Sequence, residues 1–387
     1  MNLEARIAHL ASDTDGWRQP DIYILNGQSD EAFKALLDDG RVRVVDPIHE
    51  ITEDLRELRH PDKNGNYAFK EQYDERMAAL GLSYGSWVHL PWKQTVIRYP
   101  EAGDHRDLRT FRNQHLVTAD EQRVLNRASV AVFGLSVGSN ITDQLVQSGI
   151  GDTYVLGDFD RLSPTNLNRI RATMGQVGLR KVDIMAQKIS EIDPYITQYH
   201  LHNGYNDDAN AVLDTARPDI IIEEVDDLST KAKLRAYAAK NKTPLIMVTD
   251  LGEKSIIDIE RHDQGEVKPF NGKVSQALFE DLIVDGLTEK EKRAALMKIA
   301  GVRHLSPRII ESAMDRGKTL GGLPQLGATA VAGAALANTA TREILLGRKM
   351  RSGSYVQSPG KTLKTQRPTT IKQDIYTYKK FLQFLKS

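Results

Sequence analysis

A loop of small residues and a nearby acid are the first residues of this sequence whose types and spacing could bind a ligand. Gly134, Ser136 and Gly138 lie between an apolar run at 130–133 and a stretch with helical periodicity. In such a loop, backbone N–H groups can approach phosphates, and the positive end of the helix dipole favours them. Asp158 follows the next strand-like run and can accept hydrogen bonds from ribose hydroxyls. A simple tight turn and a solvated acid are the alternatives, but together these residues predict a nucleotide site.

A polar cluster downstream distinguishes between two kinds of nucleotide. The run 158–169, DFDRLSPTNLNR, contains Asp160, Asn166 and Arg169, and Lys181 follows it. A dinucleotide has no need of this cluster, whereas a triphosphate does, because Arg and Lys can neutralise its charge and Asn can orient it. The cluster therefore favours ATP over NAD, with polar loop residues of no special role as the alternative.

An acidic segment follows a third strand-like run, which is rich in isoleucine. Its sequence is EEVDD at 223–227, and it contains Asp226. Neighbouring carboxylates repel one another unless a cation or solvent separates them, and Mg²⁺ prefers oxygen ligands of this kind. A metal ion is therefore a physically sensible partner of this segment, with a solvated acidic loop as the alternative.

The run GDFDRLSPTNLNR at 157–169 resembles the signature of the ThiF, MoeB and ubiquitin-activating-like adenylyltransferase superfamily. The resemblance covers about residues 106–350. It implies that Asp158 holds the ribose of ATP, that Arg169 and Lys181 act on the phosphates, and that Asp226 is the magnesium-binding catalytic aspartate. The implied ATP-binding residues are Gly134, Ser136, Gly138, Asp158, Asp160, Asn166, Arg169 and Lys181.

Two finer resemblances concern assembly and subgroup. The segment FRNQ at 111–114 is similar to the family segment whose arginine reaches the ATP of the partner subunit, which implies a homodimer with Arg112 as a catalytic residue. Arg109 is the weaker candidate for the same role. The segments GLSVGS, PTNLNRIRA, EIDPY and EEVDD resemble a MoeY-like bacterial subgroup of ThiF domains.

The chain departs from the superfamily pattern in its lack of cysteine. With no Cys residue, the paired CxxC zinc motifs and the thioester-forming cysteine of ubiquitin-type activators are both absent. Ile170 also follows Arg169, where the superfamily usually has Gln. We therefore expect the reaction to stop at the acyl-adenylate or to pass the acyl group directly to a nucleophile.

Strand-like and helix-like patterns alternate through the middle of the chain. Besides 130–133, apolar runs at 153–156, 219–222 and 245–248 read as strands. The alternation predicts an α/β fold with a Rossmann-like, mostly parallel sheet and helices on both faces. We expect an N-terminal accessory α+β domain at 1–105, the ATP-binding adenylation domain at 106–350, and a C-terminal extension at 351–387 that ends in a docked aromatic helix.

Composition limits the partners and the location of the chain. Lys plus Arg and Asp plus Glu both number 52, so the formal charge is zero and nothing global attracts nucleic acid or anionic lipid. The N-terminus lacks the long apolar core of a signal peptide, and the most apolar window, 326–340, is too short to span a bilayer. We expect a cytoplasmic protein with no membrane or nucleic acid partner.

These patterns predict an enzyme that uses ATP to adenylate a substrate carboxylate. The sequence does not identify the substrate that carries this carboxylate, which is a ubiquitin-like protein C-terminus, a peptide or a small acid. An NAD(P)-binding oxidoreductase is one alternative, which the Asn, Arg and Lys cluster disfavours. A non-catalytic scaffold subunit is the other, which the retention of the candidate positions disfavours.

Overall fold

A seven-stranded sheet forms the centre of the computed structural model, which describes residues 17–25, 30–301, 304–364 and 371–384. Its strand order is β11-β10-β9-β8-β5-β6-β7. The pairs from β9 to β7 are parallel, whereas β10 pairs antiparallel with both β9 and β11. The strands are β5 Ser129–Phe133, β6 Thr153–Gly157, β7 Thr197–Leu201, β8 Ile220–Glu223, β9 Leu245–Leu251, β10 Lys254–Glu260 and β11 Gly353–Gln357.

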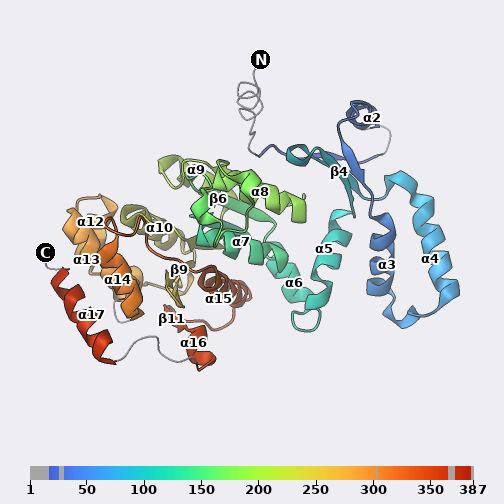
Figure 1. Ribbon diagram of the computed structural model, residues 1–387. Coiled ribbons are helices and arrows are strands. Elements are labelled where there is room, and N and C mark those ends of the chain that lie inside the picture. The colour runs from blue at the N-terminus through green and yellow to red at the C-terminus, as the bar shows by residue number, and fades with distance from the viewer. Residues whose placement is uncertain (1–16, 26–29, 302–303, 365–370, 385–387) are drawn as a thin grey trace, which may run out of the picture.

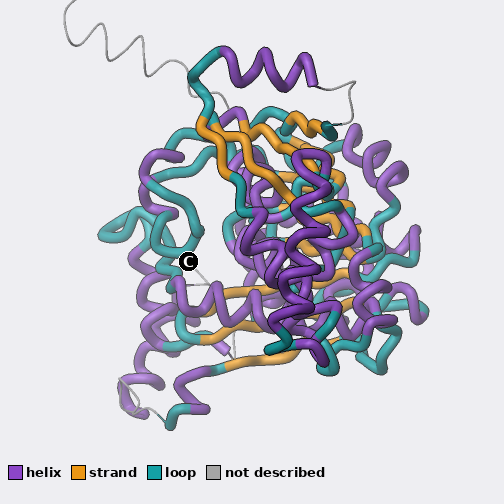
Figure 2. The backbone as a smooth tube through the Cα atoms, turned by 90° about the vertical axis from the view of Figure 1, so that its right-hand side faces the viewer, coloured by secondary structure: helices purple, strands orange, loops and turns teal. Residues whose placement is uncertain are grey.

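Helices cover both faces of this sheet (Figures 1 and 2). On one face, α7, α8 and α15 pack against side chains such as Val132, Ile222 and Val248. On the other face, α9 and α10 cover Phe133 and Ile221. The helices from the centre to the C-terminal side are α6 Ala119–Asn126, α7 Val137–Gln147, α8 Lys181–Ile192, α9 Asp207–Ala216, α10 Leu228–Asn241, α11 Pro269–Gly272, α12 Gln276–Ile283, α13 Glu289–Ala300, α14 Pro307–Asp315, α15 Gly327–Leu345, α16 Pro359–Thr362 and α17 Ile371–Phe384.

The observed architecture confirms the expected α/β fold with a mostly parallel sheet. The fully apolar runs that read as strands in the sequence form the four central strands, because a parallel sheet covered on both faces buries both sides of each strand. Three strands of the sheet, β7, β10 and β11, were not predicted, since their sequences carry polar residues at several positions.

A smaller four-stranded sheet precedes the central one, with the order β1-β3-β4-β2. It docks on the end of α8, where the Tyr99 hydroxyl donates to the Glu191 carbonyl at 2.8 Å and Trp92 Nε1 donates to the Glu191 carboxylate at 2.7 Å. Figure 1 shows this region and α17 at opposite ends of the molecule. Its elements are β1 Asp21–Tyr23, α2 Asp30–Asp38, β2 Arg43–Val45, α3 Ile48–Arg59, α4 Tyr67–Leu80, β3 Ser86–Leu90, β4 Thr95–Tyr99 and α5 Ala102–Thr110.

The central sheet does not end at the expected boundary after residue 350. The strand β11 at 353–357 lies in the segment expected to be a separate extension, yet it pairs with β10 as the edge of the sheet. The helix α5 likewise continues across the boundary expected at 105. Beyond β11, α17 packs against α14, where Thr377 Oγ1 donates to Glu311 Oε1 at 3.0 Å.

A helix that crosses a bilayer must be about 20 residues long and mostly apolar. Within the described part of the chain, no helix is both long and apolar enough to cross a bilayer.

A buried ion-pair network joins α10 to two strands of the central sheet. Arg235 Nη1 lies 2.7 Å from a Glu223 carboxylate oxygen of β8, and Arg235 Nε lies 2.7 Å from Glu260 Oε1 of β10. All three side chains are essentially inaccessible to solvent. Burying two carboxylates is costly, and the guanidinium between them offsets that cost.

We therefore expect Arg235→Met to destabilise the fold by about 3 to 5 kcal/mol, because it leaves the buried Glu260 carboxylate without its cation and Glu223 with Lys231 alone. Urea denaturation followed by circular dichroism measures the change. Lys233→Met, at an exposed position of the same helix, is the matched control and should change little. Equal stability of the two variants would contradict this account of the network.

Candidate active site

The turn between β5 and α7 approaches the end of β8 more closely than any side chain would permit. Gly134 has a φ of 88°, and a Cβ at this position would lie 2.3 Å from the carbonyl oxygen of Glu224. Only glycine fits there. The turn is followed by Ser136 and by Gly138 in the first turn of α7, so the helix N-terminus points to the carboxyl edge of the sheet. This is the arrangement that a phosphate-binding loop requires.

Asp158 lies directly after β6 and faces this turn. Its carboxylate accepts hydrogen bonds from the backbone N–H groups of Leu135 at 2.6 Å and Asp160 at 2.7 Å. Burial raises the pKa of Asp158, while Lys181 and the two N–H groups oppose that rise. The side chain is therefore fixed beside the glycine turn, as the expected ribose contact requires.

Lys181 begins α8 and is held by acidic neighbours. Its Nζ lies 2.6 Å from Asp160 Oδ2 and 3.8 Å from Asp158 Oδ2. The lysine is only 7% exposed, whereas Asp160 is on the surface. A phosphate that binds Lys181 must compete with the Asp160 carboxylate for the same ammonium group.

The loop between β6 and α8 contains the other two predicted phosphate contacts. The Asn166 side-chain oxygen accepts from the Ser163 N–H at 3.0 Å, so it caps a short turn and leaves only its amide nitrogen for a ligand. Arg169 donates from Nε to Ser136 Oγ at 3.2 Å, which links this loop to the glycine turn. Burial lowers the pKa of the Arg169 guanidinium, and the carboxylates of Asp226 and Asp250 raise it.

Asp226 lies in the exposed turn between β8 and α10. Its neighbour Asp227 caps α10 by accepting from the Thr230 N–H at 2.7 Å, whereas Asp226 makes no hydrogen bond within the described part of the chain. No cluster of three metal-ligating side chains is present among the described residues. A single carboxylate suits Mg²⁺ that arrives with a nucleotide, since phosphate oxygens and water supply its remaining ligands.

Two further buried carboxylates at this edge were not predicted from the sequence. Glu224 accepts from the Val248 N–H at 2.6 Å, and burial raises its pKa well above the usual range. Asp250, near the end of β9, has no hydrogen-bond partner among the described residues for either carboxylate oxygen. Burial raises its pKa to about 6, and Arg169 opposes the rise. Asp250 could have been predicted from the sequence, because it is an acid that follows an apolar run, as Asp158 and Asp226 are.

The two candidates for the trans-acting arginine have different environments. Arg109 donates to Asp193 Oδ2 at 2.7 Å and to the Val146 carbonyl at 2.8 Å, so it ties α5 to the central domain. Arg112 is exposed, with its guanidinium 5.4 Å from the centroid of the Phe111 ring. Of the two, Arg112 is therefore the one available to a ligand.

The structure does not bring Arg112 to the other site residues. The adjacent Asn113 donates to the carbonyl of Ser148, just beyond the C-terminus of α7, whereas the glycine turn lies at the N-terminus of that helix. At 1.5 Å per residue, the helix separates these two points by roughly 16 Å. Arg112 can therefore meet an ATP only if a second subunit presents one.

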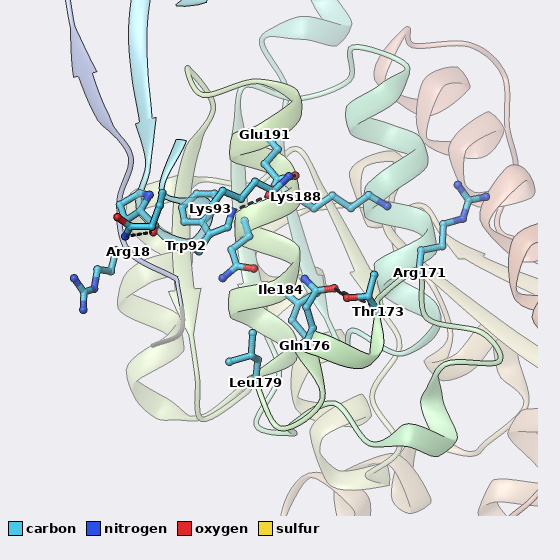
Figure 3. A pocket seen from close by; sticks show the side chains of 14 residues that line it. Arg18, Trp92, Lys93, Arg171, Thr173, Gln176, Leu179, Ile184, Lys188 and Glu191 are labelled. Carbon is cyan, nitrogen blue, oxygen red and sulfur yellow. Dashed lines mark hydrogen bonds and ion pairs between the residues drawn. The ribbon is translucent and has the colours of Figure 1, made fainter. Parts of the chain in front are cut away.

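A cavity of about 770 Å³ lies between the smaller sheet and α8, and Figure 3 shows it. It shares Arg171, Ile184 and Lys188 with a smaller pocket that Leu135 and Lys181 also line. The lining of the larger cavity carries more basic than acidic side chains. The residues around the larger cavity are Arg18, Pro91, Trp92, Lys93, Gln94, Arg171, Thr173, Gly175, Gln176, Leu179, Ile184, Gln187, Lys188 and Glu191.

Comparison with known proteins places the chain in a family. Residues 110–374 match the ThiF family, which is more than half of the chain, so the protein belongs to the ThiF family. This finding confirms the resemblance seen in the run 157–169.

Several curated relatives are similar over part of the chain. The uncharacterized protein MT1398 of Mycobacterium tuberculosis is 35% identical over 272 residues, which are 69% of this chain and 37% of the relative. The tRNA threonylcarbamoyladenosine dehydratase of Haemophilus influenzae is 29% identical over 43% of this chain and 65% of its own length. Ubiquitin-like modifier-activating enzyme 5 of Aedes aegypti is 36% identical over 94 residues, 24% of this chain and 23% of the relative. The chain thus spans less than two thirds of each of these relatives.

Two solved structures share limited similarity with the chain. PaaA is 19% identical with a TM-score of 0.46, and the match covers 68% of this chain and 78% of PaaA. Escherichia coli MccB in complex with ATP is 16% identical with a TM-score of 0.46, and the match covers 65% of this chain and 71% of MccB.

The buried carboxylate of Asp250 should make the stability of the folded protein depend on pH. Its pKa rises from the ordinary value of 3.8 to about 6 in the folded protein, so the folded state holds this proton more tightly than the unfolded chain does. The associated stabilisation is complete below about pH 4 and is lost as the pH rises through about 6. Asp250→Asn removes the titration. Its stability relative to wild type should therefore increase by on the order of 2 kcal/mol between pH 4 and pH 8.

Urea denaturation at the two pH values measures this difference. Glu253→Gln, an exposed carboxylate in the β9–β10 turn, is the control and should show no such increase. A constant difference between Asp250→Asn and wild type at both pH values would contradict the burial of a carboxylate there.

Proposed function

We propose that this ThiF-family chain binds ATP at the carboxyl edge of its sheet and adenylates a substrate carboxylate, with release of pyrophosphate. The observation that carries the proposal is the position of Arg169. Its guanidinium bonds to the glycine turn through Ser136 and lies in the field of Asp226 and Asp250. A triphosphate at the N-terminus of α7 would therefore meet a cation on one side and a magnesium-binding acid on the other.

The residues of the site would divide the work between binding and charge stabilisation. Asp158 would hold the ribose, the backbone of Gly134, Ser136 and Gly138 would approach the phosphates, and the Asn166 amide would orient them. The substrate carboxylate, already ionised at neutral pH, attacks the α-phosphorus in line. A new oxygen–phosphorus bond forms as the bond to pyrophosphate breaks. Arg169 and Lys181 would neutralise the charge that develops on the phosphoryl oxygens.

Magnesium suits the donor set at Asp226, an exposed carboxylate beside the guanidinium of Arg169. When bound, the ion would neutralise charge on the phosphates and help to align them. Lys181 would leave Asp160 for the phosphates, because a phosphate carries more negative charge than one carboxylate.

The carboxylate substrate is proposed as a class: a ubiquitin-like protein C-terminus, a peptide or a small acid. The names of two relatives, a modifier-activating enzyme and a tRNA threonylcarbamoyladenosine dehydratase, support activation chemistry of this kind. The zero formal charge favours these substrates over nucleic acid. We further propose a cytoplasmic homodimer with an N-terminal accessory domain that ends at α5, followed by an adenylation domain and by a C-terminal extension that begins beyond β11.

Carboxylate-dependent exchange of labelled pyrophosphate into ATP tests the proposed function. A panel of ubiquitin-like tails, peptides and small acids should contain members that support exchange in the presence of Mg²⁺. The proposal fails if ATP binds but no carboxylate class supports exchange, or if exchange proceeds equally well without any carboxylate.

Asp226→Asn should nearly abolish magnesium-dependent exchange while the fold stays intact, because the amide cannot replace a carboxylate ligand of the ion. Asp227→Asn is the matched control. Asn caps helices as well as Asp does, so α10 keeps its cap and exchange should persist. Near wild-type exchange in Asp226→Asn would remove Asp226 from the mechanism.

Arg112→Ala should lower the rate by about 10³-fold or more, as loss of other arginine fingers does. Because Arg112 lies at the far end of α7 from the glycine turn, we propose that it acts on the ATP of a partner subunit. Mixing Arg112→Ala with Asp226→Asn subunits should restore part of the activity, since one hybrid site is complete. Failure to complement despite demonstrated subunit exchange, or an active monomer, would count against the dimeric site.

Activation should end without a covalent link between the enzyme and its substrate, because the chain has no cysteine to form a thioester. Labelled carboxylate should therefore leave the protein on denaturation, and AMP should appear in step with product. Label that survives denaturation and is released by hydroxylamine would reveal an ester intermediate and refute this course of the reaction.

A further inference from the structure

Asp250 lies at the candidate active site on the same face of the sheet as α15. It follows Ile246 and Val248 at alternate positions of β9, and those two side chains belong to the core beneath α7 and α15. The Asp250 carboxylate lies against Gly333 of α15. Its charge acts on Arg169, the proposed phosphate contact, and on Glu224 at the end of β8. Asp250 is therefore close to the reacting phosphate without being one of the predicted ATP contacts.

The carboxylate of Asp250 lacks the hydrogen bonds that its burial requires. Neither oxygen has a partner among the described residues, although both are shielded from solvent. By contrast, Asp158 accepts two backbone N–H groups and Glu224 accepts one. A buried carboxylate is an acceptor only, and leaving it unpaired costs free energy. The geometry at this edge of the sheet therefore calls for a ligand that brings hydrogen-bond donors.

The absence of cysteine determines what kind of ligand this site needs. An acyl-adenylate formed here must be attacked by a nucleophile from outside the chain. A primary amine is protonated at neutral pH, and its ammonium group carries three donors and a positive charge. An ammonium group thus supplies what Asp250 lacks, and it becomes a nucleophile once a base removes its proton.

We propose that Asp250 binds the ammonium group of a primary-amine acyl acceptor and accepts its proton. This inference rests on the proposed function and specifies its second substrate. The amine lone pair forms a bond to the acyl carbon, and the bond from that carbon to the AMP oxygen breaks. The products are an amide and AMP, and the two protons lost by nitrogen pass by way of the Asp250 carboxylate to solvent.

The charged groups around Asp250 are consistent with this role. Burial raises its pKa to about 6 and Arg169 opposes the rise, so the carboxylate is ionised at neutral pH and is still basic enough to accept a proton. Glu224, the other buried acid nearby, is engaged by the Val248 N–H and lies beneath the glycine turn. Glu224 therefore already has a hydrogen-bond donor, which Asp250 lacks.

The two half-reactions of the enzyme test the proposal. With a carboxylate that supports pyrophosphate exchange, Asp250→Asn should retain exchange, but methylamine-dependent amide formation and AMP release should fall by about 10²-fold or more. Glu253→Gln, the exposed neighbour in the β9–β10 turn, should retain both. Hydroxylamine is largely unprotonated at neutral pH and needs no base, so Asp250→Asn should still form the hydroxamate at near wild-type rates.

The results that overturn the proposal differ from those that overturn the proposed function. Equal methylamine-dependent rates in Asp250→Asn and wild type, or a joint loss of exchange and hydroxamate formation, remove Asp250 from the second step. Calorimetric binding of methylammonium to the complex with a non-hydrolysable ATP analogue gives a separate readout that needs no carboxylate. Binding in wild type and its loss in Asp250→Asn would support the site even if no carboxylate supports exchange, whereas no binding to wild type would refute it.

Discussion

The contact between the glycine turn and the end of β8 is the constraint on which the site depends. Because a Cβ at Gly134 would lie 2.3 Å from the carbonyl of Glu224, the first turn of α7 can approach the neighbouring strand only in the absence of a side chain. This approach brings the N-terminus of α7 next to Asp158 on one side and the acidic segment after β8 on the other. The parallel order of β9, β8, β5 and β6 then places all their carboxyl ends at one edge.

Charge balance at that edge explains how the candidate site is stable without a bound nucleotide. Lys181 is paired with Asp160, and Arg169 is bonded to Ser136 and Asn168, so neither cation is buried alone. Asp250 is less well satisfied, since neither of its carboxylate oxygens has a partner among the described residues. A bound substrate would therefore replace the present partners of Lys181 and Arg169, whereas the Asp250 carboxylate would gain a partner. The buried carboxylate of Asp250 is costly for stability, and acids whose pKa is shifted by burial are common at functional sites.

Much of the site could be predicted from the sequence because its signals are local. The glycine turn, Asp158 and the cluster from Asn166 to Lys181 lie within one continuous segment from β5 to the start of α8, and apolar runs that contain valine mark its strands. The sequence did not predict that the Asn166 side chain accepts a hydrogen bond from the Ser163 N–H, because this contact depends on the conformation of one turn.

Asp250 and β11 were missed for a different physical reason. Asp250 joins the site only because β9 pairs with β8 and α15 covers its face, both of which are long-range contacts. The strand β11 is short and half exposed, and it becomes a strand only through its pairing with β10. Edge strands of this kind carry a weak hydrophobic pattern, so their place follows from tertiary structure.

The fate of a substrate carboxylate oxygen tests the central claim most directly. If the carboxylate attacks the α-phosphorus of ATP, a heavy-oxygen label in that carboxylate must appear in AMP after the acyl group is transferred. Mass spectrometry of the nucleotide products should therefore find labelled AMP and unlabelled pyrophosphate. Label in orthophosphate together with ADP would show attack on the γ-phosphorus, and it would contradict adenylation at this site.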